Sequence, residues 1–207
     1  VESLTASVQE AMVGTPFSLT LTIKNDGAYP LPERTPVTFY KKGSSVAIAT
    51  MYTQKDLPVG STDSLTRNFT LPDKVGEHVY YAVINEQQQV GELVYTNNTS
   101  PEVTIKATSP FTASVKTDKK FYRQGETVTI TGQLTGEKAV NSTIDIYMIN
   151  NGAREVKNVT TDADGQFTYE WQLYALQSGH FSLGACYKDD PTTEEMASFD
   201  VYGLKRT

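Results

Sequence analysis

Strict alternation of apolar and polar residues over positions 17–23 constrains this chain most strongly. Serine or threonine separates apolar side chains at every second position, which are Phe17, Leu19, Leu21 and Ile23. This period of two predicts a β-strand with one buried face, because successive side chains of a strand point to opposite faces. Comparable short segments recur between turn signals roughly every 8–12 residues, the spacing of a β-sandwich. The sequence therefore predicts an all-β fold of immunoglobulin-like antiparallel sandwiches.

The pattern of strands restarts after Pro110, close to the middle of a chain of 207 residues. This length suits one or two domains. We expect two consecutive sandwich domains, residues 1–107 and 108–207. Residues 107–111 are expected to form a short, semi-rigid linker. A single larger sandwich is the alternative, and the restart counts against it.

Charge and composition exclude several functional classes. The net charge is −6 and neither half of the chain is basic, which disfavours a nucleic-acid partner. Apolar runs fall well short of the ~20 residues of a spanning helix, so direct membrane insertion is not expected. The missing initiator Met and the strand-like tail from Phe199 to Leu204 suggest a piece of a longer protein, with export signals or anchors outside it.

Residue types that commonly carry catalysis are sparse. The only histidines are His78 and His180, one in each half, and both are expected at the surface or at a strand edge. Cys186 is the single cysteine, which excludes an intramolecular disulfide, and we expect it to be a small buried side chain. Because no paired acid and base or activated nucleophile is evident, we predict a protein without enzymatic activity and without a cofactor.

Two acidic segments invite comparison with calcium loops, since hard cations prefer clustered carboxylates. A denser acidic loop contains Asp189, Asp190, Glu194 and Glu195. It is a candidate for weak calcium binding, although a solvated loop is the more usual outcome. Residues 162–165 lack the remaining ligands of a calcium loop, and a hairpin turn is expected there instead.

Aromatic residues supply the other candidate site. Phe167, Tyr169 and Trp171 share one face of a predicted strand, which assigns them to the core rather than to a sugar-stacking platform. Val79, Tyr81 and Val83 alternate along another predicted strand, residues 78–84. The candidates for exposed, ligand-facing aromatics are Tyr29, Tyr52, Tyr80, Tyr95 and Tyr174. Nothing in the sequence indicates that these side chains converge.

The first domain resembles CARDB, the cell-adhesion-related domain of bacteria and archaea. The resemblance is carried by residues 13–14, 17–27, 37–43, 57–60, 76–84 and 92–98, and it covers most of residues 1–106. The proline-heavy segment 30–36 and the polar run 86–89 depart from the family pattern. The resemblance implies an extracellular sandwich module of a large surface protein.

The second domain looks like macroglobulin-like or bacterial Ig-like domains. The matching residues are 121–132, the Thr161–Phe167 segment, Gly179 and Phe181, within roughly residues 110–202. The resemblance implies a fold and an extracellular array but no catalytic residue, and a fold alone does not give a function.

Three functions remain open. The favoured one is a structural spacer or adhesion segment of a larger bacterial surface or secreted protein. The alternatives are a module that binds carbohydrate or a host protein, and an accessory region of a secreted protease or glycosidase. The expected partners are other domains of the same polypeptide, with a glycan or an extracellular protein as further candidates. The expected location is extracellular or at the cell surface, with the periplasm as an alternative.

Overall fold

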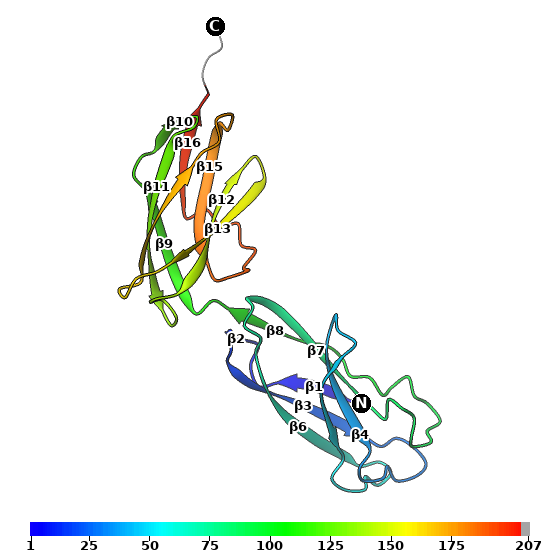
Figure 1. The fold of residues 1–207 in the computed structure, drawn as a ribbon. Helices are drawn as coiled ribbons and strands as arrows, with labels where there is room; N and C mark the ends of the chain where they lie inside the picture. Colours follow the sequence, from blue (N-terminus) through cyan, green and yellow to red (C-terminus); the bar gives the residue numbers. More distant parts are fainter. Residues whose placement is uncertain (204–207) are drawn as a thin grey trace. The chain divides into compact units, whose positions relative to one another are not determined.

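The computed structural model describes residues 1–203, and its secondary structure consists of strands and turns (Figure 1). The chain divides into two compact units between Thr108 and Ser109. Unit 1 comprises residues 1–108, and unit 2 begins at residue 109. The prediction of consecutive immunoglobulin-like sandwiches is confirmed. No helix in the described residues is long and apolar enough to cross a membrane.

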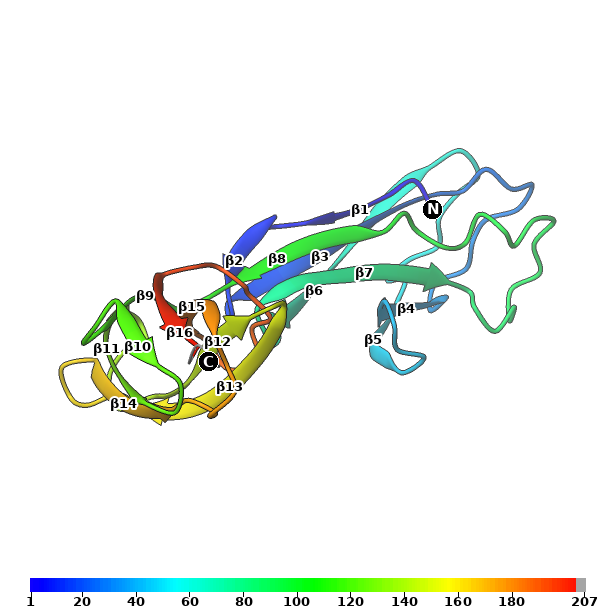
Figure 2. The ribbon, with the colours of Figure 1, turned by 90° about the horizontal axis from the view of Figure 1, so that it is seen from above.

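Unit 1 is a sandwich of a three-stranded and a five-stranded sheet (Figures 1 and 2). Its strands are β1 (Ser3–Ala6), β2 (Glu10–Met12), β3 (Pro16–Lys24), β4 (Pro36–Lys41), β5 (Ala47–Tyr52), β6 (Thr62–Thr70), β7 (Gly76–Ile84) and β8 (Val103–Thr108). The smaller sheet has the order β1-β3-β6, and the larger has the order β2-β8-β7-β4-β5.

Unit 2 is built in the same way. Its strands are β9 (Phe111–Thr117), β10 (Phe121–Arg123), β11 (Thr127–Gly136), β12 (Thr143–Asn150), β13 (Ala153–Thr160), β14 (Gln166–Gln172), β15 (Gly179–Cys186) and β16 (Ala197–Tyr202). The smaller sheet joins β14, β11 and β9, and the larger has the order β10-β16-β15-β12-β13. The predicted strand-like tail ends at Tyr202 in β16, and Leu204 lies outside the described residues.

The two units have the same strand order. In both, the first strand joins the smaller sheet and the second strand joins the larger sheet. β1 and β9 each pair antiparallel with the third strand of their unit. β2 and β10 each pair parallel with the last strand, β8 and β16 respectively. The chain therefore contains the same topology twice.

The core of unit 1 lies between its sheets and follows the alternation of β3. Phe17, Leu19, Leu21 and Ile23 are all buried, as predicted. Their serine and threonine neighbours face outward, where the Thr20 and Thr66 hydroxyl oxygens lie 2.9 Å apart across the β3–β6 pair. Phe39 from β4 completes this core with its ring 5.5 Å from that of Phe69.

The buried face of β7 carries its even-numbered residues, which overturns two expectations. Directly opposite residues of paired strands share a face, and Ala82 of β7 lies opposite the fully buried Phe39. Tyr80 is consequently only 3% exposed, so its assignment as a ligand-facing aromatic is wrong. His78 is buried on the same face, and its expected place at the surface is wrong as well.

The core of unit 2 is centred on aromatic rings from its larger sheet. Phe181 and Phe199 stack with ring centroids 5.1 Å apart, and Tyr122 meets Phe199 edge-on at 5.0 Å. From the smaller sheet, Trp171 and Phe167 are buried as predicted. Cys186 is also buried, as expected.

Two hairpin turns were predicted in unit 2, and the structure confirms one of them. Asn151 and Gly152 join β12 to β13 with φ angles of 50° and 77°, the left-handed conformation that a tight hairpin requires. The segment 162–165 joins β13 to β14, which belong to different sheets, so the expected hairpin there is wrong. The Asp162 carboxylate shapes this turn by accepting the backbone N–H of Asp164 and of Gln166, both at 2.9 Å.

Candidate functional site

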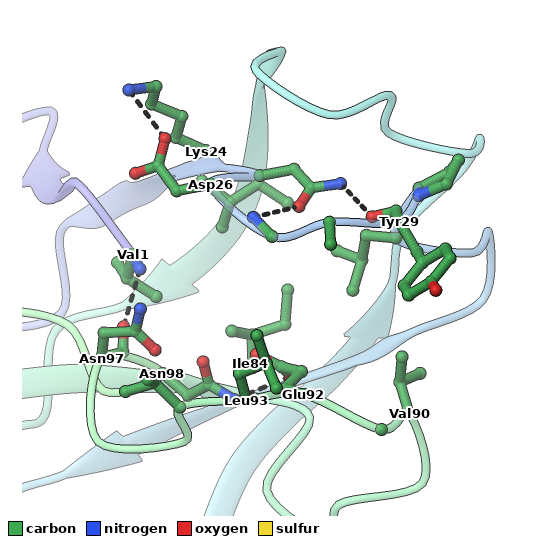
Figure 3. Close-up of a pocket in the computed structure, with 18 residues that line it drawn as sticks. Val1, Lys24, Asp26, Tyr29, Ile84, Val90, Glu92, Leu93, Asn97 and Asn98 are labelled. Carbon is green, nitrogen blue, oxygen red and sulfur yellow. Dashed lines mark hydrogen bonds and ion pairs between the residues drawn. The ribbon is translucent and has the colours of Figure 1, made fainter.

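A groove of about 690 Å³ lies at one end of unit 1 (Figure 3). Two loops bound it: residues 25–31, which follow β3, and residues 90–98, which follow the end of β7. Ile23 and Ile84, near the ends of these strands, contribute buried side chains to the lining. Both loops therefore begin at strands whose side chains are packed in the core of the sandwich.

The side chain of Asn25 makes three hydrogen bonds that hold the first loop, and a backbone bridge between Leu31 and Leu57 holds its far end. Its Nδ2 donates to the backbone oxygens of Tyr29 at 2.9 Å and Leu57 at 2.8 Å. Its Oδ1 accepts the N–H of Gly27 at 3.0 Å, which is the local turn that asparagine favours. This side chain fixes both the start of the loop and the backbone at Tyr29.

The second loop is held by a network that begins at Asn85. This residue is fully buried and adopts a left-handed φ of 53°. Its side-chain amide donates to the Val90 carbonyl at 2.8 Å and accepts the Val90 N–H at 3.0 Å. The Glu92 carboxylate accepts from Nδ2 of Asn85 at 2.5 Å and from Nδ2 of Asn98 at 3.0 Å. The Glu92 N–H in turn donates to the Tyr95 hydroxyl at 2.9 Å.

Apolar side chains on the rim are exposed although the loops beneath them are ordered by these bonds. The exposed fractions are 83% for Tyr29, 93% for Leu93 and 52% for Val94. The nearby charges are satisfied locally, because Lys24 Nζ lies 2.8 Å from the Asp26 carboxylate. The hydrogen bond that Lys24 donates to the Asp26 carboxylate raises the pKa of Lys24. The groove is suited to non-covalent binding through apolar contact.

The CARDB family model matches residues 1–102 of this chain. Residues 1–102 form a CARDB domain. The groove and both of its loops lie within this domain.

Solved structures give remote likenesses. A crystal structure of a CARDB domain from Pyrococcus furiosus in complex with di-metal ions is 20% identical, over 51% of this chain and 86% of that one, with a TM-score of 0.43. The Escherichia coli adhesin FdeC is 13% identical, over 97% of this chain and 64% of that one, with a TM-score of 0.38. Comparison with curated proteins gives no match.

The CARDB domain brings two of the predicted aromatics to its groove loops. Tyr29 stands on the rim, and Tyr95 is half-buried with its hydroxyl bonded within the second loop. Tyr52 is exposed at the end of β5, outside the groove lining, and Tyr174 is exposed in unit 2. The five candidates therefore do not form one site. Ligand binding by the four that remain accessible stays a prediction.

The acidic loop predicted for calcium lies in unit 2, outside the CARDB domain. Two of its carboxylates have protein partners: Asp190 accepts the Thr192 N–H at 3.0 Å, and Glu195 lies 3.1 Å from Nε2 of His180. Asp189 and Glu194 contribute backbone groups to hydrogen bonds. Over residues 1–203, no three His, Cys, Asp or Glu side chains are grouped so that they could hold a metal ion. Calcium binding by this loop stays a prediction.

Proposed function

We propose that this chain is a non-catalytic adhesion segment of a larger surface or secreted protein, and that the groove of its CARDB domain is the adhesive site. The observation that carries the proposal is the exposed apolar rim of Tyr29, Leu93 and Val94 on two loops fixed by internal hydrogen bonds. An extracellular or cell-surface location and a glycan or extracellular protein as partner belong to the same proposal.

The hydrogen bonds that brace the groove loops support the proposed binding role. Binding residues often stand on loops that a rigid scaffold positions. Loops that are already ordered lose less conformational entropy when a partner binds, which improves affinity. In the groove, Asn25 fixes one loop, while Asn85 and Glu92 fix the other. The loops that carry the rim residues are thus braced by hydrogen bonds before any partner arrives.

The nearby charged groups support a binding role over a catalytic one. A catalytic acid or base must reach a reacting atom. The Glu92 carboxylate instead accepts two side-chain amides, and Asp26 is paired with Lys24. These groups shape the loops.

The repeated strand order favours a second role as a spacer. The same topology recurs in both units, and only two residues separate β8 from β9. Modules of this kind can present other domains of the same polypeptide without binding a ligand themselves.

Binding of residues 1–207 to an array of glycans and extracellular-matrix proteins tests the adhesive role. We expect a saturable signal that Leu93→Asp and Tyr29→Ala reduce at least tenfold. Leu176→Asp is the matched control, because Leu176 is an 86% exposed leucine in unit 2. No saturable binding would leave the spacer role, and equal loss in the control variant would exclude the groove as the site.

A further inference from the structure

The strand β5 occupies an open edge of the larger sheet of unit 1. Among the described residues it pairs with β4 alone. Its counterpart in unit 2 is β13, which ends the larger sheet at the same position and pairs with β12. An open edge presents backbone donors and acceptors to any strand that can approach it. The two units therefore allow a direct comparison of how an edge is protected.

The two edges differ in charge. β13 carries Arg154, Glu155 and Lys157, and charged side chains are a common protection against strand pairing. β5 reads Ala-Ile-Ala-Thr-Met-Tyr and contains no charged residue. Ile48 and Tyr52 on β5 are 41% and 49% exposed. The edge of unit 1 thus lacks the charged side chains that unit 2 has at the same place.

Backbone directions show which groups of β5 face the open side. Tyr52 lies opposite Pro36, whose carbonyl accepts the Asn85 N–H from the β7 side at 2.9 Å. Groups of directly opposite residues in an antiparallel pair point either toward each other or both away. Tyr52 therefore directs its backbone away from β4, where its carbonyl accepts the side-chain amide of Gln54 at 2.8 Å. Thr50, two residues earlier, also directs its backbone away from β4. A β-bulge between Phe39 and Tyr40 shifts the register near Ile48, so the regular edge runs from Ala49 to Tyr52.

A strand that fills this edge needs an uncharged, extended segment with exposed apolar side chains, and β5 itself meets that description. We propose that β5 pairs antiparallel with β5 of a second copy of this chain, about a two-fold axis through Thr50. Within the regular edge, this register sets Thr50 opposite Thr50, and Ala49 opposite Met51 of the second copy. Threonine side chains directly opposite each other stabilise a sheet through their hydroxyl groups. The pairing is self-complementary, as a two-fold interface requires.

The dimer is independent of the adhesive role proposed for the groove, because β5 does not line the groove. Sedimentation velocity of residues 1–207 at increasing concentration is the first test. We expect a monomer–dimer equilibrium that Thr50→Pro and Thr50→Lys abolish. Proline removes the outward N–H, and lysine places like charges across the axis. Val156→Lys on β13 is the matched control and should leave the dimer intact.

Cross-linking tests the register. Hydrogen-bonded partners in an antiparallel pair have Cα atoms about 5.5 Å apart, within disulfide reach. Thr50→Cys should therefore cross-link two copies under mild oxidation, whereas in Tyr52→Cys the two thiols would start about 13 Å apart and should not. Cys186 is buried and should not compete. A monomer at every concentration, or a dimer that both Thr50 variants leave intact while far-ultraviolet circular dichroism shows them folded, would overturn the proposal.

Discussion

The Glu92 carboxylate and the Asn98 side-chain amide are joined by a hydrogen bond of 3.0 Å that spans the second groove loop. The same carboxylate oxygen also accepts the amide of the fully buried Asn85. One acidic side chain thus connects the end of β7 to the segment that leads back toward β8. The shape of the groove depends on this carboxylate.

Replacing Glu92 by alanine should loosen that loop. Two amide donors would lose their acceptor, which typically lowers stability by roughly 1–3 kcal/mol. Urea unfolding and hydrogen exchange of residues 90–98 measure the effect. Glu102→Ala is the control, because it removes only the exposed pair with Lys42 and should change stability by less than about 1 kcal/mol. Equal exchange rates in wild type and Glu92→Ala would contradict the role of the network.

Replacing Gly132 by alanine should destabilise unit 2. A Cβ at this position would overlap the ring of Phe167, which is buried and pairs with Gly132 across β11 and β14. Overpacking of this kind lowers stability by roughly 1–3 kcal/mol. Chemical unfolding provides the measurement. Gly91→Ala is the control, since no atom lies within 4 Å of its added Cβ; a comparable loss in both variants would argue against the clash.

Stability should depend weakly on pH through His180. Hydrogen bonds to Glu195 and Asp200 raise the pKa of His180 above its ordinary value of 6.5. The folded state therefore favours the protonated ring, so this stabilisation is complete below pH 6.5 and is lost as the pH rises through the higher folded pKa. The side chain is 58% exposed, which keeps the effect small and sensitive to salt.

An NMR titration of the His180 ring measures this shift, and unfolding midpoints on either side of pH 6.5 measure its consequence. His180→Gln should remove that part of the pH dependence. A ring that titrates at or below the ordinary value would show that the two carboxylates do not hold the proton.

Cys186 should resist alkylation in the folded protein. Burial raises the pKa of its thiol to about 12, so the reactive thiolate is scarce at neutral pH. We expect iodoacetamide to label it only after denaturation, as followed by intact-mass measurement. Rapid labelling under native conditions would show that β15 opens readily near its end.

The local sequence pattern was sufficient to predict which face of β3 is buried, but it was insufficient to predict the buried face of β7. In β3, serine and threonine alternate with apolar residues, so only one face can be buried. In β7, Val79, Tyr81 and Val83 on one face compete with Tyr80, Ala82 and Ile84 on the other. The partner strands determine which face of β7 is buried, because Phe39 and Ile105 fix the register that turns the even-numbered residues inward. That information is not local to the strand.

The loops of the groove were likewise only partly predictable from the local sequence. The turn at Asn25 could be predicted, since an asparagine side chain commonly accepts the backbone N–H two residues later, here that of Gly27. The second loop depends on Asn85 in a left-handed conformation and on bonds from it to Val90 and Glu92, five and seven residues away. Neither the spacing nor the composition of these residues predicts such a network. The sequence likewise does not predict the exposure of Leu93.

The parallel pairing of β2 with β8, and of β10 with β16, has a mechanical consequence. In each unit, a strand near the entry of the chain lies beside the strand by which the chain leaves, and both run in the same direction. Tension along the polypeptide pulls these neighbours lengthwise in opposite senses. The hydrogen bonds between them then resist shear together instead of opening one at a time, as they would in a hairpin pulled from its ends. Each unit should therefore resist extension at the pair formed by its second and its last strand.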